Sequence, residues 1–150
     1  MKFIIQRVQY ARVAVNGEVV GSIDRGYLVL IGVSDADTKN IADKMVRKMV
    51  GLRIFRDDAG KTNLNLEAVG GSLLLISQFT LYADCHHGNR PSFIQAGKPE
   101  HAQALYEYIA SKCAETVPNV QTGIFGAEMK VELLNDGPFT IILDSEELGY

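Results

Sequence analysis

The stretch GSLLLISQFTLYAD, residues Gly71–Asp84, decides how the rest of the chain is interpreted. Its apolar run Leu73–Ile76 follows two glycines and is short enough to be a buried strand. Side chains on a strand alternate, which predicts one face with Leu74, Ile76, Gln78, Thr80 and Tyr82 and another with Leu73, Leu75, Ser77, Phe79 and Leu81. The polar residues lie where such a strand reaches solvent, a usual place for a functional site. The alternative is a strand that leaves the core with its hydroxyl groups bonded to neighbouring backbone.

Size and composition predict one domain, residues 1-150. The 47% hydrophobic and 22% charged residues are typical of an ordinary globular protein. A chain of this length buries about 68–70% of its unfolded surface, enough for a core without disulfides or metals. The net charge of −3 provides no global positive field for nucleic acid. Any contact with RNA must therefore be local and involve few phosphates.

Cys85 and Cys113 have no metal-like spacing, and free thiols in a reducing compartment are the simplest interpretation. The opening MKFIIQRV is not a signal peptide, because it has a single lysine and only three apolar residues in a row before Gln6 and Arg7. No uncharged run is long enough to span a membrane. We therefore expect a cytoplasmic protein without a membrane partner.

Alternating or apolar runs predict the strands Lys2–Val8, Tyr10–Val15, Glu18–Ile23, Tyr27–Val33, Val120–Phe125, Lys130–Leu134 and Thr140–Asp144. Asn16-Gly17 predicts a tight hairpin, because both central positions of a type I′ turn need positive φ. The apolar strand Tyr27–Val33 should be central and covered on both faces.

Two helices are expected, one at about Lys39–Leu52 and one at about Glu100–Glu115. Asp37 or Thr38 is the N-cap of the first helix, and Pro99 starts the second. With the strands, these helices predict an α+β fold with a mostly antiparallel, barrel-like β core.

The sequence lacks the common catalytic templates. It has no HExxH, phosphate-binding loop, paired CxxC or dinucleotide fingerprint, so we expect neither a metal nor a cofactor. Ser77 and Thr80 are potential nucleophiles, but no base stands beside them and there is no G-x-S-x-G elbow. The loop Cys85–Lys98 is either an exposed polar loop or a rim whose basic groups meet phosphates: His86, His87, Arg90 and Lys98.

Gly137-Pro138 lies between two predicted strands, where a proline cannot donate a ladder hydrogen bond. A plain turn explains it without any function. The proline isomer does not follow from sequence, since only about 5–6% of X-Pro bonds in folded proteins are cis. A cis bond would let the Gly137 and Pro138 carbonyls point the same way and capture an ammonium group.

The segments SQFTLYAD and NDGPFT, the latter residues 135–140, together resemble the D-aminoacyl-tRNA deacylase (D-Tyr-tRNA deacylase) family. That family carries an SQ-x-T motif and an N-x-GP-x-T motif at about this separation. The resemblance also covers KFIIQRVQYARVAVNGEVVGSI, LRIF, GKTNLNL, RPSF and TGIFGAEM, so it runs nearly end to end.

The resemblance implies an esterase that removes D-amino acids from the terminal ribose of tRNA. It implies a homodimer with two sites at the interface, in which Gly137-Pro138, as a cis peptide, enters the partner's site. Its carbonyls would bind the substrate's α-ammonium, and backbone would occupy the space that an L side chain needs. Achiral glycine, as in mischarged glycyl-tRNA, would pass this filter.

The same resemblance implies that backbone N–H groups of Ser77, Gln78, Phe79 and Thr80 stabilise the oxyanion. Two mechanisms compete for the nucleophile. Thr80 attacks in the first, and water assisted by the ribose hydroxyl attacks in the second, which we favour because Thr80 has no visible base. The terminal adenine needs an apolar slot, and the candidates for it are Phe125, Ala127 and Met129. Ordinary core packing is an equally good interpretation of these three residues.

Two other functions remain open from the residues. The first is a non-catalytic dimeric RNA-binding module, which the net charge and the lack of a basic-aromatic tract disfavour. The second is a hydrolase of small esters or amides with Thr80 or Ser77 as nucleophile. The paired residues His86 and His87 have no assigned role.

Overall fold

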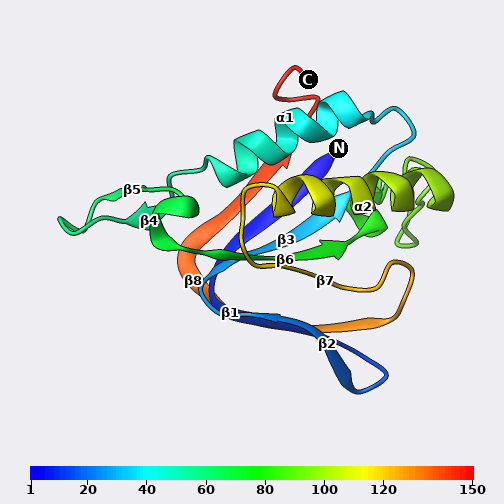
Figure 1. Cartoon of the computed structure of the whole chain (residues 1–150). Helices are drawn as coiled ribbons and strands as arrows, with labels where there is room; N and C mark the ends of the chain where they lie inside the picture. The colour runs from blue at the N-terminus through cyan, green and yellow to red at the C-terminus, as the bar shows by residue number, and fades with distance from the viewer.

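The computed structural model describes residues 1–150, and Figure 1 shows two helices lying over one face of a curled sheet. The elements in chain order are β1 Lys2–Val15, β2 Glu18–Ile23, β3 Gly26–Gly32, α1 Lys39–Val50, β4 Phe55–Arg56, β5 Thr62–Leu64, the 3-10 turn η1 Glu67–Val69, β6 Ser72–Ser77, the 3-10 turn η2 Phe79–Tyr82, α2 Pro99–Ala114, β7 Val120–Thr122 and β8 Met129–Asp144.

The α+β architecture agrees with the prediction, but the sheet is mixed rather than mostly antiparallel. Its strand order is β2-β1-β3-β6-β7, with β8 paired to β1. The β1 pairs with β2, β3 and β8 are antiparallel, while β3–β6 and β6–β7 are parallel. Parallel neighbours need long crossover connections, and α1 and α2 lie in those two connections. Sequence periodicity identifies the strands but carries no information on their direction.

The two predicted N-terminal strands are one long strand, β1. Its first half pairs with β3 and its second half with β2, so a single strand bends from one part of the sheet into the next. The β1–β2 turn has the predicted positive φ angles, 51° at Asn16 and 84° at Gly17. Gly26 is needed where β3 meets β6, since an added Cβ would lie 1.9 Å from the Ser72 carbonyl oxygen.

Both faces of the central strands are buried, as the apolar sequence of β3 indicates. Leu73 and Leu75 belong to a large cluster between the sheet and the two helices. Leu74 and Ile76 belong to a smaller cluster inside the curl of β1, β2 and β8. The predicted alternation of β6 is therefore confirmed over its apolar part.

The predicted strand character ends at Ser77. Phe79–Tyr82 forms η2, because Gln78 N–H donates to the Ile31 carbonyl and the chain then turns, with Leu81 N–H bonded to the Gln78 carbonyl. Local alternation alone favours a continued strand, whereas no neighbouring strand is present to pair with these residues. Neither α1 nor α2 has the length and apolar character needed to cross a bilayer.

Candidate functional site

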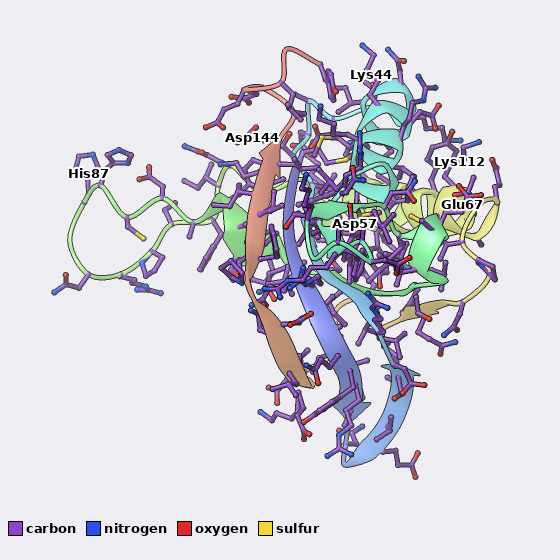
Figure 2. All side chains as sticks on the ribbon, turned by 90° about the vertical axis from the view of Figure 1, so that its left-hand side faces the viewer. Lys44, Asp57, Glu67, His87, Lys112 and Asp144 are labelled. Atoms are coloured by element: carbon purple, nitrogen blue, oxygen red, sulfur yellow. The ribbon has the colours of Figure 1, made fainter.

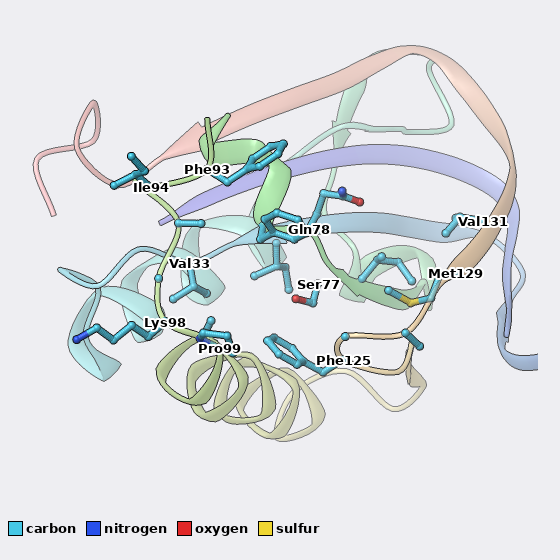
Figure 3. A pocket seen from close by; sticks show the side chains of 18 residues that line it. Val33, Ser77, Gln78, Phe93, Ile94, Lys98, Pro99, Phe125, Met129 and Val131 are labelled. Atoms are coloured by element: carbon cyan, nitrogen blue, oxygen red, sulfur yellow. The ribbon is translucent and has the colours of Figure 1, made fainter. Parts of the chain in front are cut away.

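A cavity of about 730 Å³ opens at the carboxyl end of β6, between η2, the start of α2 and the segment leading into β8 (Figure 3). Ser77, Gln78 and Phe79 of the first motif line it. The opposite wall carries the predicted adenine-slot residues Phe125, Ala127 and Met129. Segments about fifty residues apart in sequence thus meet in one cavity.

The side chains of the first motif lie on either side of the point where β6 ends and η2 begins. Ser77 ends β6, opposite Ile31 of β3, and its side chain is half-buried. The Gln78 Nε2 group donates to the Thr80 hydroxyl at 2.5 Å. Thr80 does not line the cavity itself, so its hydroxyl contacts the site through Gln78.

Backbone donors remain at the start of η2. The first residues of a helix have no acceptor inside it, and the first internal bond of η2 comes from Leu81 N–H. The N–H groups of Phe79 and Thr80 precede that bond. They therefore have no acceptor within η2, and Phe79 also lines the cavity whereas Thr80 does not.

The outer wall of the cavity is aromatic and aliphatic. Phe79 and Phe93 contact edge to face with centroids 5.1 Å apart, and both are exposed at the mouth beside Ile94. Gly97 N–H donates to the Val33 carbonyl at 2.8 Å, which fixes this wall to the end of β3. Figure 3 shows Phe93 and Ile94 on one side of the opening and Phe125 on the other.

Tyr106 of α2 supports the floor of the cavity beneath Phe125. The two ring centroids are 6.1 Å apart, and the Tyr106 hydroxyl donates to the Leu75 carbonyl at 2.8 Å. Burial raises the pKa of Tyr106 to about 12. The hydroxyl therefore stays neutral and serves as a fixed donor rather than as a base.

No histidine side chain forms a hydrogen bond with Ser77 or Thr80. His86 contacts Asp84, and its backbone N–H and ring lower the pKa of that carboxyl group. His101 Nε2 lies 3.1 Å from the Asp37 carbonyl. Figure 2 shows His87 near the tip of a loop that projects away from the body of the molecule. The structure thus contains no Ser-His-Asp triad at Ser77.

Gly137 and Pro138 lie outside this cavity. The peptide bond between them is cis, and both residues are exposed on β8. The two predicted C-terminal strands are one continuous strand, in which residues 136–139 stand opposite the single residue Arg7 of β1. This irregularity explains how proline is accommodated, because no ladder bond is required of it there.

Arg7 contacts the Gly137 segment, a role that the sequence patterns did not predict. Its guanidinium is buried, lies 3.0 Å from the Asp136 carboxylate and donates to the Gly137 carbonyl at 3.3 Å. It also lies 4.4 Å from the centroid of Phe139. A lone arginine on a predicted strand gives no signal of this role, since Asp136 is more than a hundred residues away.

No group of three or more His, Cys, Asp or Glu side chains is arranged to hold a metal ion. The thiols differ sharply, since Cys85 is exposed and Cys113 is buried. Burial raises the pKa of the Cys113 thiol to about 12, which leaves it unreactive at neutral pH.

Comparisons with known proteins identify the family. The model of the D-Tyr-tRNA(Tyr) deacylase family matches residues 4–144. The D-aminoacyl-tRNA deacylase of Stutzerimonas stutzeri (strain A1501) is 52% identical over 145 residues, which is 97% of this chain and 100% of the relative. That of Thermus aquaticus is 50% identical over 147 residues, covering 98% of this chain and 97% of the relative.

Solved structures agree with the fold. A c-Myc DNA unwinding element binding protein superposes with a TM-score of 0.91 at 39% identity, over 96% of this chain and 98% of that one. A probable eukaryotic D-amino acid tRNA deacylase superposes with a TM-score of 0.84 over 95% of this chain and 97% of that one. Its 18% identity supports the shared fold alone. The family match and the full-length relatives lead to one conclusion: this chain belongs to the D-Tyr-tRNA(Tyr) deacylase family, whose members hydrolyse the ester bond of D-aminoacyl-tRNA.

Proposed function

We propose that the chain hydrolyses D-aminoacyl-tRNA in the cavity at the end of β6, as a chiral proofreading enzyme of translation in the cytoplasm. The observation that carries the proposal is the meeting of Ser77–Phe79 with Phe125, Ala127 and Met129 around one cavity of about 730 Å³. That volume is in the range of small-molecule sites, roughly 300–1,000 Å³. It suits a terminal aminoacyl-adenosine rather than a whole acceptor stem.

The terminal adenine occupies the apolar wall of Phe125, Ala127 and Met129. The ester carbonyl then faces η2, where the N–H groups of Phe79 and Thr80 have no acceptor inside the turn. Donors aimed at a developing oxyanion are worth a factor on the order of 10²–10³ in rate each. Main chain therefore supplies most of the electrostatic stabilisation.

Gly137-Pro138 selects the D-enantiomer from a second subunit. The pair is exposed and is not part of its own cavity, which is the arrangement that a contribution in trans requires. The Gly137 carbonyl accepts from Arg7, and its second lone pair remains for the substrate's α-ammonium. Backbone then excludes an L side chain, whereas glycine, including the glycyl group of mischarged tRNA, is admitted.

Water rather than Thr80 attacks the ester, with the neighbouring ribose hydroxyl assisting. The Thr80 hydroxyl is bonded to the Gln78 amide, which cannot accept a proton as a base, and no histidine contacts Thr80. A threonine hydroxyl without a base is a weak nucleophile.

The decisive experiment compares deacylation of D-Tyr-tRNA with that of L-Tyr-tRNA. We expect the D-ester to be cleaved faster by at least two orders of magnitude, because clash with backbone is not relieved by side-chain movement. Equal rates on both esters contradict the proposal. Binding of tRNA without cleavage would favour the RNA-binding module, and equal activity on a free D-amino-acid ester would favour a small-ester hydrolase.

The nucleophile is tested separately. Thr80→Ala should lower kcat without abolishing it, while a substrate with hydrogen in place of the terminal 2′-hydroxyl should not be cleaved. Thr80→Ser is the matched variant that keeps the hydroxyl. A covalent adduct trapped on Thr80 and seen by mass spectrometry would assign the attack to Thr80 instead.

A further inference from the structure

A second cavity, of about 250 Å³, lies between the β2–β3 turn, β4 and the irregular part of β8. Its lining is Arg7, Arg25, Phe55, Arg56 and Asp136. Three guanidinium groups and one carboxylate thus surround a small space, in a chain whose net charge is −3. The residues that line this cavity therefore carry a net positive charge, although the chain as a whole is negative.

The three arginines are not equivalent. Arg7 is buried, and each of its three nitrogens already donates to a carbonyl, of Asp136, Ile54 or Gly137, while Nε also contacts the Asp136 carboxylate. Arg25 and Arg56 are exposed, and no ion pair or side-chain hydrogen bond involves either of them. Two guanidinium groups therefore retain all their donors at the edge of the cavity.

Phe55 holds one of these free arginines in place. The Arg25 guanidinium lies 5.0 Å from the centroid of the Phe55 ring, within cation–π range. Phe55 is buried and stacks on Tyr27 with centroids 5.3 Å apart and planes at 12°. A guanidinium lying on a rigid ring keeps its N–H groups free, which lowers the entropy cost of binding an anion there.

The chemistry of this lining fits a phosphate group. Guanidinium forks bind the oxygen atoms of phosphate in bidentate fashion. The one carboxylate, Asp136, is neutralised by buried Arg7, so Arg25 and Arg56 leave a local excess of positive charge. A cation or an apolar ligand is disfavoured by the same groups.

We propose that Arg25 and Arg56 bind a phosphodiester of the tRNA acceptor strand. This rests on the proposed function, in which Gly137-Pro138 meets the aminoacyl end. Asp136 lines the cavity and Gly137 follows it, and both are bonded to Arg7. The strand that carries the ester continues from the terminal nucleoside into phosphodiesters, and these are the anions next to the Gly137 segment. A few local contacts of this kind suit a chain of net negative charge.

The test uses the double variant R25A/R56A and two substrates, D-Tyr-tRNA and 3′-O-D-tyrosyl-adenosine, which has no phosphodiester. We expect KM for the tRNA to rise about tenfold, with kcat unchanged and activity on the adenosine ester unaltered. For tRNA that carries no amino acid, the logarithm of the association constant falls linearly with the logarithm of the salt concentration. This slope should become less steep by about 0.7 for each phosphate that the variant no longer neutralises. The variant R25K/R56K should recover part of the affinity.

R47A/K48A is the control matched in charge, because Arg47 and Lys48 are exposed cations of α1 without an ion-pair partner. An equal effect of R47A/K48A would mean that only total charge matters and would overturn the site. An unchanged KM and salt slope, or an equal loss on the adenosine ester, would also overturn it.

Inorganic phosphate is the other source of the same chemistry. Calorimetric binding of phosphate to the wild type but not to R25A/R56A, with tRNA affinity unchanged, would assign the cavity to the free ion and refute the RNA contact. A wild type that cleaves neither substrate would refute the proposed function alone, since the salt dependence of tRNA binding would still decide on Arg25 and Arg56.

Discussion

At the scale of single residues, Arg7 is the side chain on which the Gly137 segment depends. It is buried, and it supplies donors to three carbonyl groups and to the Asp136 carboxylate. Arg7→Ala should lower the free energy of unfolding by about 3 kcal/mol, because removing one partner leaves the others unsatisfied. Urea denaturation followed by circular dichroism measures the loss.

Arg7→Lys is the matched change, since lysine keeps the charge but not the planar fork. It should retain more stability than Arg7→Ala and still lose discrimination between D- and L-esters. Unchanged enantioselectivity in a folded Arg7→Lys protein would show that Arg7 does not position Gly137.

At the scale of elements, the start of α1 shows how tertiary contacts choose between two local possibilities. Asp37 and Thr38 are both acceptable N-caps by sequence. Thr38 takes the role and accepts from Ile41 N–H at 3.3 Å. Asp37 is buried and accepts from the Met1 ammonium at 2.6 Å and from Ser34 N–H at 2.7 Å.

Thr38→Ala should therefore reduce the free energy of unfolding by about 1 kcal/mol, through loss of one capping bond. Thermal and urea unfolding of the two proteins provide the comparison. Thr38→Ser keeps the hydroxyl and should stay close to the wild type. A full loss with serine would assign the effect to the packing of the Thr38 methyl group instead.

At the scale of the whole molecule, the outer face of β1 and β8 exposes a large apolar side chain. Ile142 is 65% exposed although it lies within a regular strand pair, opposite half-buried Ile4. Gly137-Pro138 is exposed on the same strand. The proposed dimer would bury this face and bring each Gly137 segment toward the partner's cavity.

Ile142→Asp should weaken self-association by at least about tenfold, or 1.4 kcal/mol, because a charge replaces an apolar contact. Analytical ultracentrifugation gives the dissociation constant, and D-Tyr-tRNA cleavage should fall at enzyme concentrations where the variant is monomeric. Val19→Asp, at a residue 56% exposed on β2, is the control. Equal effects at both positions would locate the interface elsewhere.

The sequence by itself determined those elements that depend on residues close together in the chain. The alternation of Leu73–Ile76 set the two buried faces of β6, Asn16-Gly17 set the β1–β2 turn, and helical periodicity set α1 and α2. Part of the main cavity lining was also named from sequence, through the first motif (Ser77, Gln78 and Phe79) and TGIFGAEM (Phe125, Ala127 and Met129), whereas Thr80, Gly137 and Pro138 lie outside it. These predictions succeed because turn stereochemistry and side-chain periodicity act between residues close in the chain.

Tertiary structure alone decided which distant segments meet. It made β3–β6 and β6–β7 parallel, ended β6 at Ser77, and merged the last two predicted strands into β8 with residues 136–139 opposite Arg7. It also brought Arg25, Arg56 and Asp136 around one cavity. The physical reason is that strand direction and ion pairing depend on contacts between residues far apart in the chain, such as Gly26 with Ser72 or Arg7 with Asp136, and periodicity within one segment does not encode them.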